Sequence, residues 1–390
     1  MFLAENFKNY LVFELKVNNF LTQIPQVYCP KSRRFAASTS SQTVIFYKIK
    51  TAMAIAILFM LWLQLIFNWD KISTSQRIQS VFYIVSLSFQ IPIVIEVFRK
   101  RFAISELFNA SIQFEMHNGY DTDYGRKFNS KKRNSQKNRV KLYTTLSITT
   151  APTILSFFWV HLYISPCIPA NLGYLFLAEC NSETIFPVTG TILKVILLSI
   201  FTWIFLCTTV TVFLEYLLYT SFQCYCFLNY IRQLKNKLGG KKCNSSGIIK
   251  IYRQIQLLVF TYNDIHRGIL TPIETTFCQF VSILSLYGTI GLSNSVAVPL
   301  QLIFAFMVVE TTLQIFEGED AIKVEVHRVS KYVLRKLRNL MVNGSKRVSI
   351  ISLPVLSIHM GGGGNFFDET TPLVLLDFAI NQTVGLLLMQ

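Results

Sequence analysis

Charged residues are scarce in this sequence. They make up 15% of its 390 residues, against about 25% in soluble proteins, too few to coat the surfaces of several water-soluble domains. Hydrophobic residues account for 52% of the chain, which excludes intrinsic disorder. The formal net charge is +16, but Lys and Arg occur in blocks between long apolar stretches, which argues against a soluble nucleic-acid-binding protein. The composition predicts a polytopic membrane protein with no nucleic-acid partner.

The sequence also lacks the patterns of common catalytic and metal sites. Its five His residues are scattered, and there is no phosphate-binding loop, dinucleotide-binding glycine pattern or Gly-x-Ser-x-Gly turn. Cys224 and Cys226 have no second pair at zinc-binding spacing, so they are interpreted as buried or palmitoylated thiols. The glycines of residues 361–364 lack a following Lys-Ser/Thr and indicate a hinge before a helix. We therefore expect no enzyme, no metal and no cofactor.

Seven apolar stretches have about the 20 residues that a helix needs to cross a bilayer. They are residues 42–67, 75–98, 142–164, 189–230, 257–288, 296–316 and 372–389. The fourth stretch is too long for one membrane crossing, and the fifth begins with the polar sequence TYNDIHRG. Both are expected to continue outside the membrane as helices. The predicted fold class is all-α, with seven transmembrane helices.

The distribution of basic residues predicts the orientation. All but four of the Lys and Arg residues lie in segments 1–50, 99–141, 232–253 and 323–347, whereas the connection 165–190 has none. Because basic residues accumulate in cytoplasmic segments, the N-terminus is predicted to be cytoplasmic and the C-terminus extracellular. Cys167 and Cys180 share the non-basic outside loop, where they either form a disulfide or remain free thiols.

Ionisable residues within the apolar stretches are functional candidates, because burying a charge in a membrane is costly. They are Glu96, Lys194, Glu215, Glu274 and Glu310. Proximity to an interface, or projection beyond the bilayer, explains all of them except Glu310.

Two short motifs mark the end of the chain. Gly364-Asn365-Phe366-Phe367 precedes the last apolar stretch, and Gln390 follows Thr383 seven residues later. The first resembles the Gly-x-Phe-Phe of insect gustatory and odorant receptors, and the second resembles the Thr-Tyr-x5-Gln-Phe motif that closes gustatory receptors. Val384 stands in place of the Tyr of that motif, and the final Phe is absent. With seven predicted spans and a cytoplasmic N-terminus, the chain resembles the insect chemoreceptor superfamily.

The resemblance implies a ligand-gated, non-selective cation channel in the plasma membrane of sensory neurons. Its partners would be a small organic tastant or odorant, permeating cations, membrane lipid and further subunits, in a homotetramer or a heterotetramer with related receptors. The terminal motif favours the gustatory type. The implied parts are a cytoplasmic segment (1–41), six helices with the ligand-binding bundle (42–316), a cytoplasmic anchor helix with a glycine hinge (317–365) and a pore-lining helix (366–390).

The resemblance also implies site residues. The pore wall would be formed by one helical face that holds Thr383, Leu386, Leu387 and Gln390, with leucines that gate by dewetting and carboxamides that replace part of an ion's hydration shell. The alternative is that this face packs on a neighbouring helix. The ligand pocket would be lined by Tyr83, Trp159, Tyr163, Phe280, Tyr287 and Phe304. For each of these aromatic residues, core packing or lipid contact is the alternative.

Two other classes of membrane protein are weaker interpretations. A G-protein-coupled receptor has seven helices but an extracellular N-terminus, and this sequence has neither Asp-Arg-Tyr after its third stretch nor Asn-Pro-x-x-Tyr in its seventh. A small-solute transporter usually shows paired halves with broken helices, and no internal repeat is found here.

Overall fold

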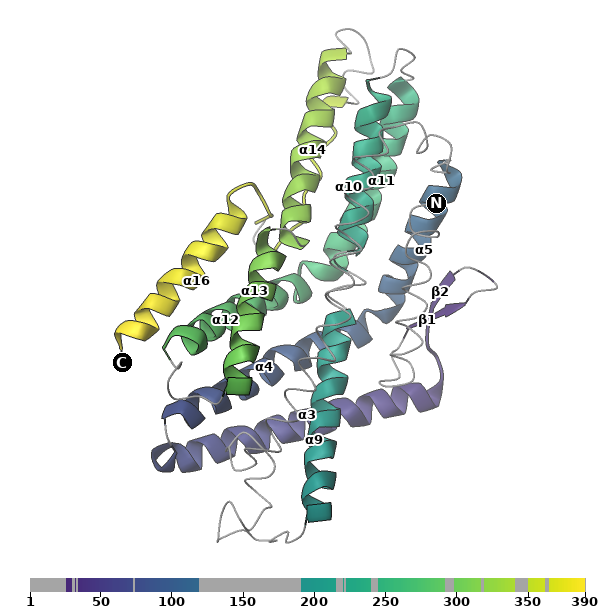
Figure 1. The fold of residues 1–390 in the computed structure, drawn as a ribbon. Coiled ribbons are helices and arrows are strands. Elements are labelled where there is room, and N and C mark those ends of the chain that lie inside the picture. The colour runs from purple at the N-terminus through teal and green to yellow at the C-terminus, as the bar shows by residue number, and fades with distance from the viewer. Residues whose placement is uncertain are drawn as a thin grey trace.

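The chain folds into two helical bundles that follow one another along the molecule (Figure 1). The computed structural model describes residues 26–29, 34–72, 74–118, 191–214, 222–239, 245–291, 298–316, 319–340, 350–361 and 365–389, with Ser32 and Thr220. The first bundle, called the span bundle, contains α3 (Ser41–Asn68), α4 (Thr74–Arg99), α9 (Thr191–Leu214), α12 (Leu270–Ile290), α13 (Val298–Phe316) and α16 (Thr371–Leu388). The second, called the stalk bundle, contains α5 (Arg101–His117), α10 (Phe222–Lys237), α11 (Ser245–His266) and α14 (Glu319–Leu340).

Several helices of the span bundle have the length and composition of membrane spans. Ser41–Lys71, Gln76–Arg99 and Thr371–Leu388 are each long and apolar enough to cross a bilayer, and α11 and α12 pass the same test only as a pair bent by 65°. These helices indicate a multi-pass membrane protein. The predicted stretch 142–164 lies outside the described residues, so seven spans and the orientation of the termini stay predictions.

The two long apolar stretches are each divided between the bundles. The fourth stretch forms α9, which ends at Leu214, and α10, which begins at Phe222 in the stalk bundle. The fifth forms α11 in the stalk bundle and α12 in the span bundle, with a turn around Gly268 between them. The connection through this turn allows the two helices to take different directions.

The span bundle has an apolar core, called the span core, to which α3, α4, α9, α12 and α13 contribute. Leu61 of α3, Phe201 of α9 and Ile303 of α13 belong to it. The outward side chains of α3 are also apolar, since Phe59 and Ile66 are exposed. A helix that is apolar on both its inner and its outer face is typical of lipid-facing spans.

The stalk bundle has a separate apolar core, called the stalk core. α14 contributes Val326, Val333 and Leu337, which recur at helical spacing on one face and are fully buried. Its opposite face exposes Arg328 and Lys331. The stalk core is thus built on amphipathic helices, as cores of water-soluble proteins are, with α10 packed between α11 and α14.

A small β-hairpin departs from the all-α prediction. β1 (Gln26–Cys29) pairs antiparallel with β2 (Arg34–Ala37), and both strands have only four residues. The side chain of Asn109 on α5 holds the hairpin, since the Phe35 N–H donates to Asn109 Oδ1 and Asn109 Nδ2 donates to the Phe35 carbonyl, both at 2.8 Å. Such short strands depend on these tertiary contacts and leave no long alternating pattern in the sequence.

Candidate functional site

Three of the six predicted ligand-binding aromatic residues lie together in the span core. Tyr83 of α4, Tyr287 of α12 and Phe304 of α13 are all buried in this one cluster. The ring of Phe82 joins two of them, with centroids 5.8 Å from both Tyr83 and Phe304. We call these four residues the aromatic cluster. Its members come from three helices, so a change in their packing would alter the arrangement of the bundle.

A glycine beside the aromatic cluster makes room for one of its rings. A Cβ atom added to Gly288 of α12 would lie 2.4 Å from a carbon of the Phe304 ring, and that carbon belongs to a buried, restrained side chain. α12 and α13 therefore approach closely at this point because residue 288 has no side chain.

Polar groups accompany the aromatic cluster on the same helices. Ser80 of α4, one turn before Tyr83, and Ser285 of α12 are fully buried, and within the described part of the chain their hydroxyl oxygens have no hydrogen-bond partner. The same holds for both polar atoms of the Gln279 side chain. Since buried polar groups are normally hydrogen-bonded, these groups are suited to bind a small molecule that brings its own donors and acceptors.

The remaining predicted ligand residues lie elsewhere. Phe280 is partly exposed on α12, where its ring faces Phe89 of α4 at a centroid distance of 6.0 Å. Trp159 and Tyr163 lie outside the described residues, as do Cys167 and Cys180, so the choice between a disulfide and free thiols stays open. Cys224 and Cys226, interpreted as buried or palmitoylated thiols, are fully buried in the stalk core.

The last helix, α16, begins from a short segment that is tied to the stalk bundle. His359 pairs with Phe366 in an isolated bridge, and the Phe367 N–H donates to the Ile358 carbonyl at 3.1 Å. We call the described residues 358–361 and 365–367 the lead-in. Asp368 then caps α16, because its Oδ1 accepts the backbone N–H groups of Thr370 and Thr371, both at 3.0 Å.

The two phenylalanines of the lead-in have different surroundings. Phe366 stacks on the imidazole of His327 of α14, with ring centroids 4.8 Å apart. Phe367 is fully buried in the stalk core. The Gly-x-Phe-Phe motif thus fixes the start of α16 to α14, a role that the sequence alone did not reveal.

The two faces of α16 differ in their contacts. The face predicted to line a pore packs toward the rest of the chain, since Thr383 is 4% exposed, and Leu386 and Leu387 are partly buried against the span core. α16 packs here on α12 and α13. Within one subunit, this face therefore packs on neighbouring helices, as in the alternative to a pore wall. The fourth predicted pore residue, Gln390, lies outside the described residues.

The opposite face of α16 is exposed and carries a carboxylate. Phe378, Val384 and Leu388 are exposed apolar side chains on it. Asp377 lies on the same face, and its Oδ2 accepts a hydrogen bond from Asn381 Nδ2 one turn later at 3.1 Å. Placing a carboxylate against lipid costs about 2.5–3.5 kcal/mol or more, so this face is suited to water or to protein rather than to lipid.

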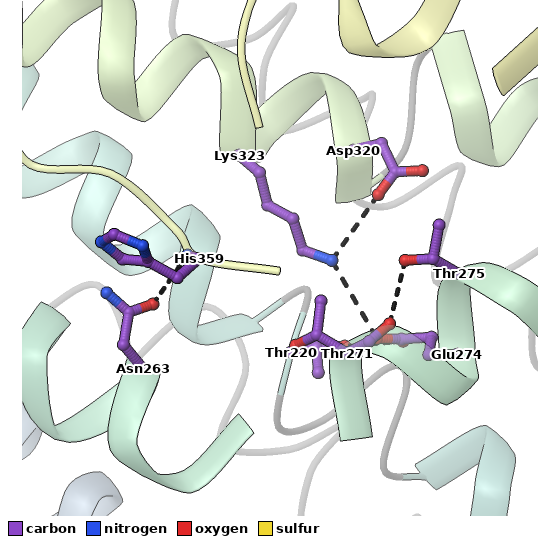
Figure 2. A network of polar contacts seen from close by, with 8 residues as sticks. All are labelled: Thr220, Asn263, Thr271, Glu274, Thr275, Asp320, Lys323 and His359. Carbon is purple, nitrogen blue, oxygen red and sulfur yellow. Dashed lines mark hydrogen bonds and ion pairs between the residues drawn. The ribbon is translucent and has the colours of Figure 1, made fainter. Parts of the chain in front are cut away.

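A buried network of charged groups lies where the two bundles meet (Figure 2). Lys323 of α14 is 1% exposed, and its Nζ lies 3.6 Å from Asp320 Oδ1 and 4.0 Å from Glu274 Oε2 of α12. Thr220 Oγ1 donates to Glu274 Oε1 at 3.5 Å. The same ammonium lies 4.5 Å from the centre of the Phe367 ring. One lysine therefore contacts α12, its own helix and the lead-in of α16.

Sequence reasoning missed this network for an identifiable reason. Glu274 appeared as a span residue near an interface, and Lys323 was counted as one charge of a basic cytoplasmic segment. The available signal was the Asp320–Lys323 spacing of three residues, which places both side chains on one face of a helix. Removing one partner of a buried ion pair destabilises a protein by about 3–5 kcal/mol, so the network holds the two bundles together.

Comparisons with known proteins agree with the architecture. No family model and no curated protein sequence matches the chain. Its fold is similar to the solved structure of the insect olfactory receptor OR5 from Machilis hrabei, with a TM-score of 0.60 and 10% identity over 98% of both chains. The same receptor in complex with eugenol gives a TM-score of 0.63 and 12% identity over 98% of this chain and 97% of that one. The resemblance to insect chemoreceptors that the sequence indicates is therefore confirmed at the level of the fold, which this chain shares with an insect olfactory receptor.

Proposed function

We propose that the chain belongs to the insect chemoreceptor superfamily and forms a ligand-gated, non-selective cation channel that a small organic molecule opens. The observation that carries this proposal is α16, an apolar helix of spanning length whose exposed face bears Asp377 and Asn381. A carboxylate on an otherwise apolar span requires a polar environment. A water-filled cation pathway between subunits supplies that environment, and the shared fold supports the same interpretation.

The pore is proposed to lie between the α16 helices of several subunits. The exposed stripe of Asp377, Val384 and Leu388 is available to other subunits, because the other face packs on α12 and α13. The residues predicted from the motif lie at the end of the same helix, where Leu387 follows Val384 by three positions and borders this stripe. The motif-based alternative for the pore wall is the face of Thr383, Leu386 and Gln390, and it requires this face to leave α12 and α13.

The ligand is proposed to bind at the aromatic cluster. Tyr83, Tyr287 and Phe304 offer aromatic surface, and the hydroxyls of Ser80 and Ser285 offer buried hydrogen-bonding groups. A phenol or a small aromatic alcohol matches this combination. Eugenol, which is bound to the receptor from Machilis hrabei, is one such compound. Phe280, Trp159 and Tyr163 remain proposed contributors to the pocket.

The assembly, type and location follow from the same proposal. Four subunits around one pore, identical or combined with related receptors, would cover the exposed faces of α16. The stalk bundle would be the cytoplasmic anchor, the N-terminus would be cytoplasmic, and the site of action would be the plasma membrane of sensory neurons. The terminal motif of Thr383 and Gln390 favours a gustatory role over an odorant one.

Recording from excised patches tests the proposed function. The chain is expressed in cells that lack chemoreceptors, and outside-out patches are exposed to a panel of phenols and aromatic alcohols that includes eugenol. We expect an evoked current that Na⁺ and K⁺ both carry and that falls when N-methyl-D-glucamine replaces them. Tyr287→Leu should reduce the response more than Tyr332→Leu, since Tyr332 is exposed on α14. A response seen only in whole cells and lost on G-protein inhibition would favour a G-protein-coupled receptor instead.

An epitope placed after Gln390 tests the topology in intact cells. The proposal requires antibody to reach this epitope without permeabilisation and to reach an N-terminal epitope only after it. The reverse result would contradict both the orientation and the channel.

A further inference from the structure

Lys323 lies where α12, α14 and the lead-in of α16 meet. Glu274 is in the second turn of α12, and Asp320 and Lys323 are in the first two turns of α14 (Figure 2). Phe367 precedes α16 by four residues. The Lys323 ammonium contacts all three groups within 4.5 Å. In addition to the direct packing of α16 on α12 and α13, Lys323 thus connects α12 to the start of the proposed pore helix.

The lead-in of α16 is held firmly enough to transmit a displacement. Asn263 of α11 donates from Nδ2 to the Ser357 carbonyl at 2.9 Å and accepts the His359 N–H on Oδ1 at 3.0 Å. Across the turn at Gly361, the Met360 N–H donates to the Asn365 carbonyl at 2.8 Å. Phe367 is followed directly by Asp368 and the first turn of α16, so a shift of Phe367 would displace the start of this helix.

α12 connects the network to the aromatic cluster. Glu274 and Tyr287 are thirteen residues apart on one helix, which corresponds to about 20 Å at a rise of 1.5 Å per residue. The 65° bend between α11 and α12 lies just before Glu274. α12 can therefore tilt about this turn while α11 stays in the stalk core, and such a tilt changes the distance between Glu274 and Lys323.

The two carboxylates near Lys323 differ in how they move. Asp320 lies on the same helix as Lys323, so their separation is unaffected by a tilt of α12. Glu274 moves with α12. In the structure the ammonium is shared between both carboxylates, and a tilt of α12 that withdraws Glu274 would leave it paired with Asp320 alone, at a different position over the Phe367 ring. Two discrete arrangements that both sites bias are the physical requirement for coupling.

We propose that Lys323 is the positioning residue that couples the ligand-binding bundle to the pore helix, by linking Glu274 of α12 in series with Phe367 of the lead-in. This inference rests on the proposed channel function. Ligand-driven tilting of α12 shifts Lys323, and Lys323 shifts the start of α16. Cutting either contact weakens the coupling between binding and opening, and cutting both contacts has no larger effect than cutting one.

Single-channel recording with a double-mutant cycle tests the coupling. The variants are Lys323→Met, Glu274→Gln, Phe367→Leu and the Glu274→Gln/Phe367→Leu pair, and the probe is eugenol or whichever compound of the panel gives the largest current. We expect the gating equilibrium constant at saturating probe to fall about tenfold in each variant, within the range of typical coupling. The unitary conductance should stay unchanged, and the double variant should match the single ones.

Two controls separate coupling from folding. Lys331→Met makes the same substitution at an exposed position of α14 and should behave as wild type. Lys323→Arg keeps the charge and its attraction to the Phe367 ring, and it should restore most of the opening that Lys323→Met loses. Surface labelling of each variant corrects for expression. If Lys323→Met fails to reach the surface, the milder Glu274→Gln carries the comparison.

The outcomes distinguish this inference from the proposed function. A conducting wild type with opening unchanged in Glu274→Gln and Lys323→Met overturns the coupling role but leaves the channel intact. Multiplying effects in the double variant would show that Glu274 and Phe367 act independently of one another, which also overturns it. A wild type silent to every compound of the panel would overturn the proposed function and this inference with it.

Discussion

Adjacent residues of α16 provide a direct test of which face meets the ion pathway. Thr383 is 4% exposed, and its hydroxyl donates to the Ala379 carbonyl at 2.7 Å, whereas Val384 is 46% exposed. Consecutive residues of an α-helix point about 100° apart. With 46% against 4%, the accessible fractions differ by a factor of about 11, so a cysteine at position 384 should react at least about tenfold faster than one at position 383.

The assay uses a permanently cationic methanethiosulfonate reagent applied during evoked current in outside-out patches. A charged reagent does not reach lipid-facing thiols, so progressive block in Val384→Cys would mark this face as part of the aqueous path. Val384→Ser has no thiol and corrects for native cysteines, of which Cys29 is exposed among the described residues. Faster block in Thr383→Cys than in Val384→Cys would refute the packing argument and favour the pore face predicted from the motif.

Four further predictions concern other parts of the structure. Gly288→Val should overpack the Phe304 ring and lower the stability of the span bundle by about 1–3 kcal/mol, measured as the melting temperature in detergent; an unchanged melting temperature would contradict this close approach. Asp377→Asn should lower the permeability of cations relative to chloride, most clearly at low ionic strength, in reversal-potential measurements, and an identical reversal potential would remove this residue from the pathway. Asp368→Ala should lower the free energy of unfolding by about 1 kcal/mol through the lost cap. Hydrogen bonds from Thr370 and Thr371 lower the pKa of Asp368, so the stability that this cap gives the wild type should stay constant between pH 6 and 8 and fall only at more acidic pH. Burial, and then the charge of Lys331, lower the pKa of His327. The neutral side chain stacked on Phe366 therefore contributes stability above pH about 6.5, and this contribution declines as the pH falls further. His327→Phe should reduce this acid sensitivity in melting curves, and equal sensitivity in both proteins would show that His327 is not its source.

The sequence predicted the apolar helices closely because membrane spans are encoded by local composition. The first predicted stretch, 42–67, agrees with α3, and the last, 372–389, agrees with α16. An apolar run of this length can form few structures other than a membrane-spanning helix. Three of the aromatic residues named from the sequence, Tyr83, Tyr287 and Phe304, share one buried cluster that the sequence did not indicate, and their role in ligand binding stays a prediction.

Tertiary pairing was not predictable from the same patterns. Lys50 and Lys323 were counted with basic cytoplasmic segments, yet each is 1% exposed, and Lys50 Nζ lies 3.4 Å from Thr211 Oγ1. The number of basic residues in a segment indicates its side of the membrane but not the partner of any one of them. α5 was missed as well, because it lies in a segment that was interpreted only from its charge. The apolar face of α5 can be assigned to a core only when the other helices of the stalk core are known.

The composition of the stalk core constrains the order of biosynthesis. Its members run from Phe35 through α5, α10, α11 and α14 to Phe367, so it cannot close until residue 367 has been translated. At about 5–20 residues per second, α3 and α4 remain in the bilayer for tens of seconds before α12 and α13, their partners in the span core, have been synthesised. During this time Lys50 is inserted before Thr211 exists to bind it. Nascent chains of this fold therefore depend on the insertion machinery and on lipid to shelter early helices, and a stalled ribosome would leave those helices without their native neighbours.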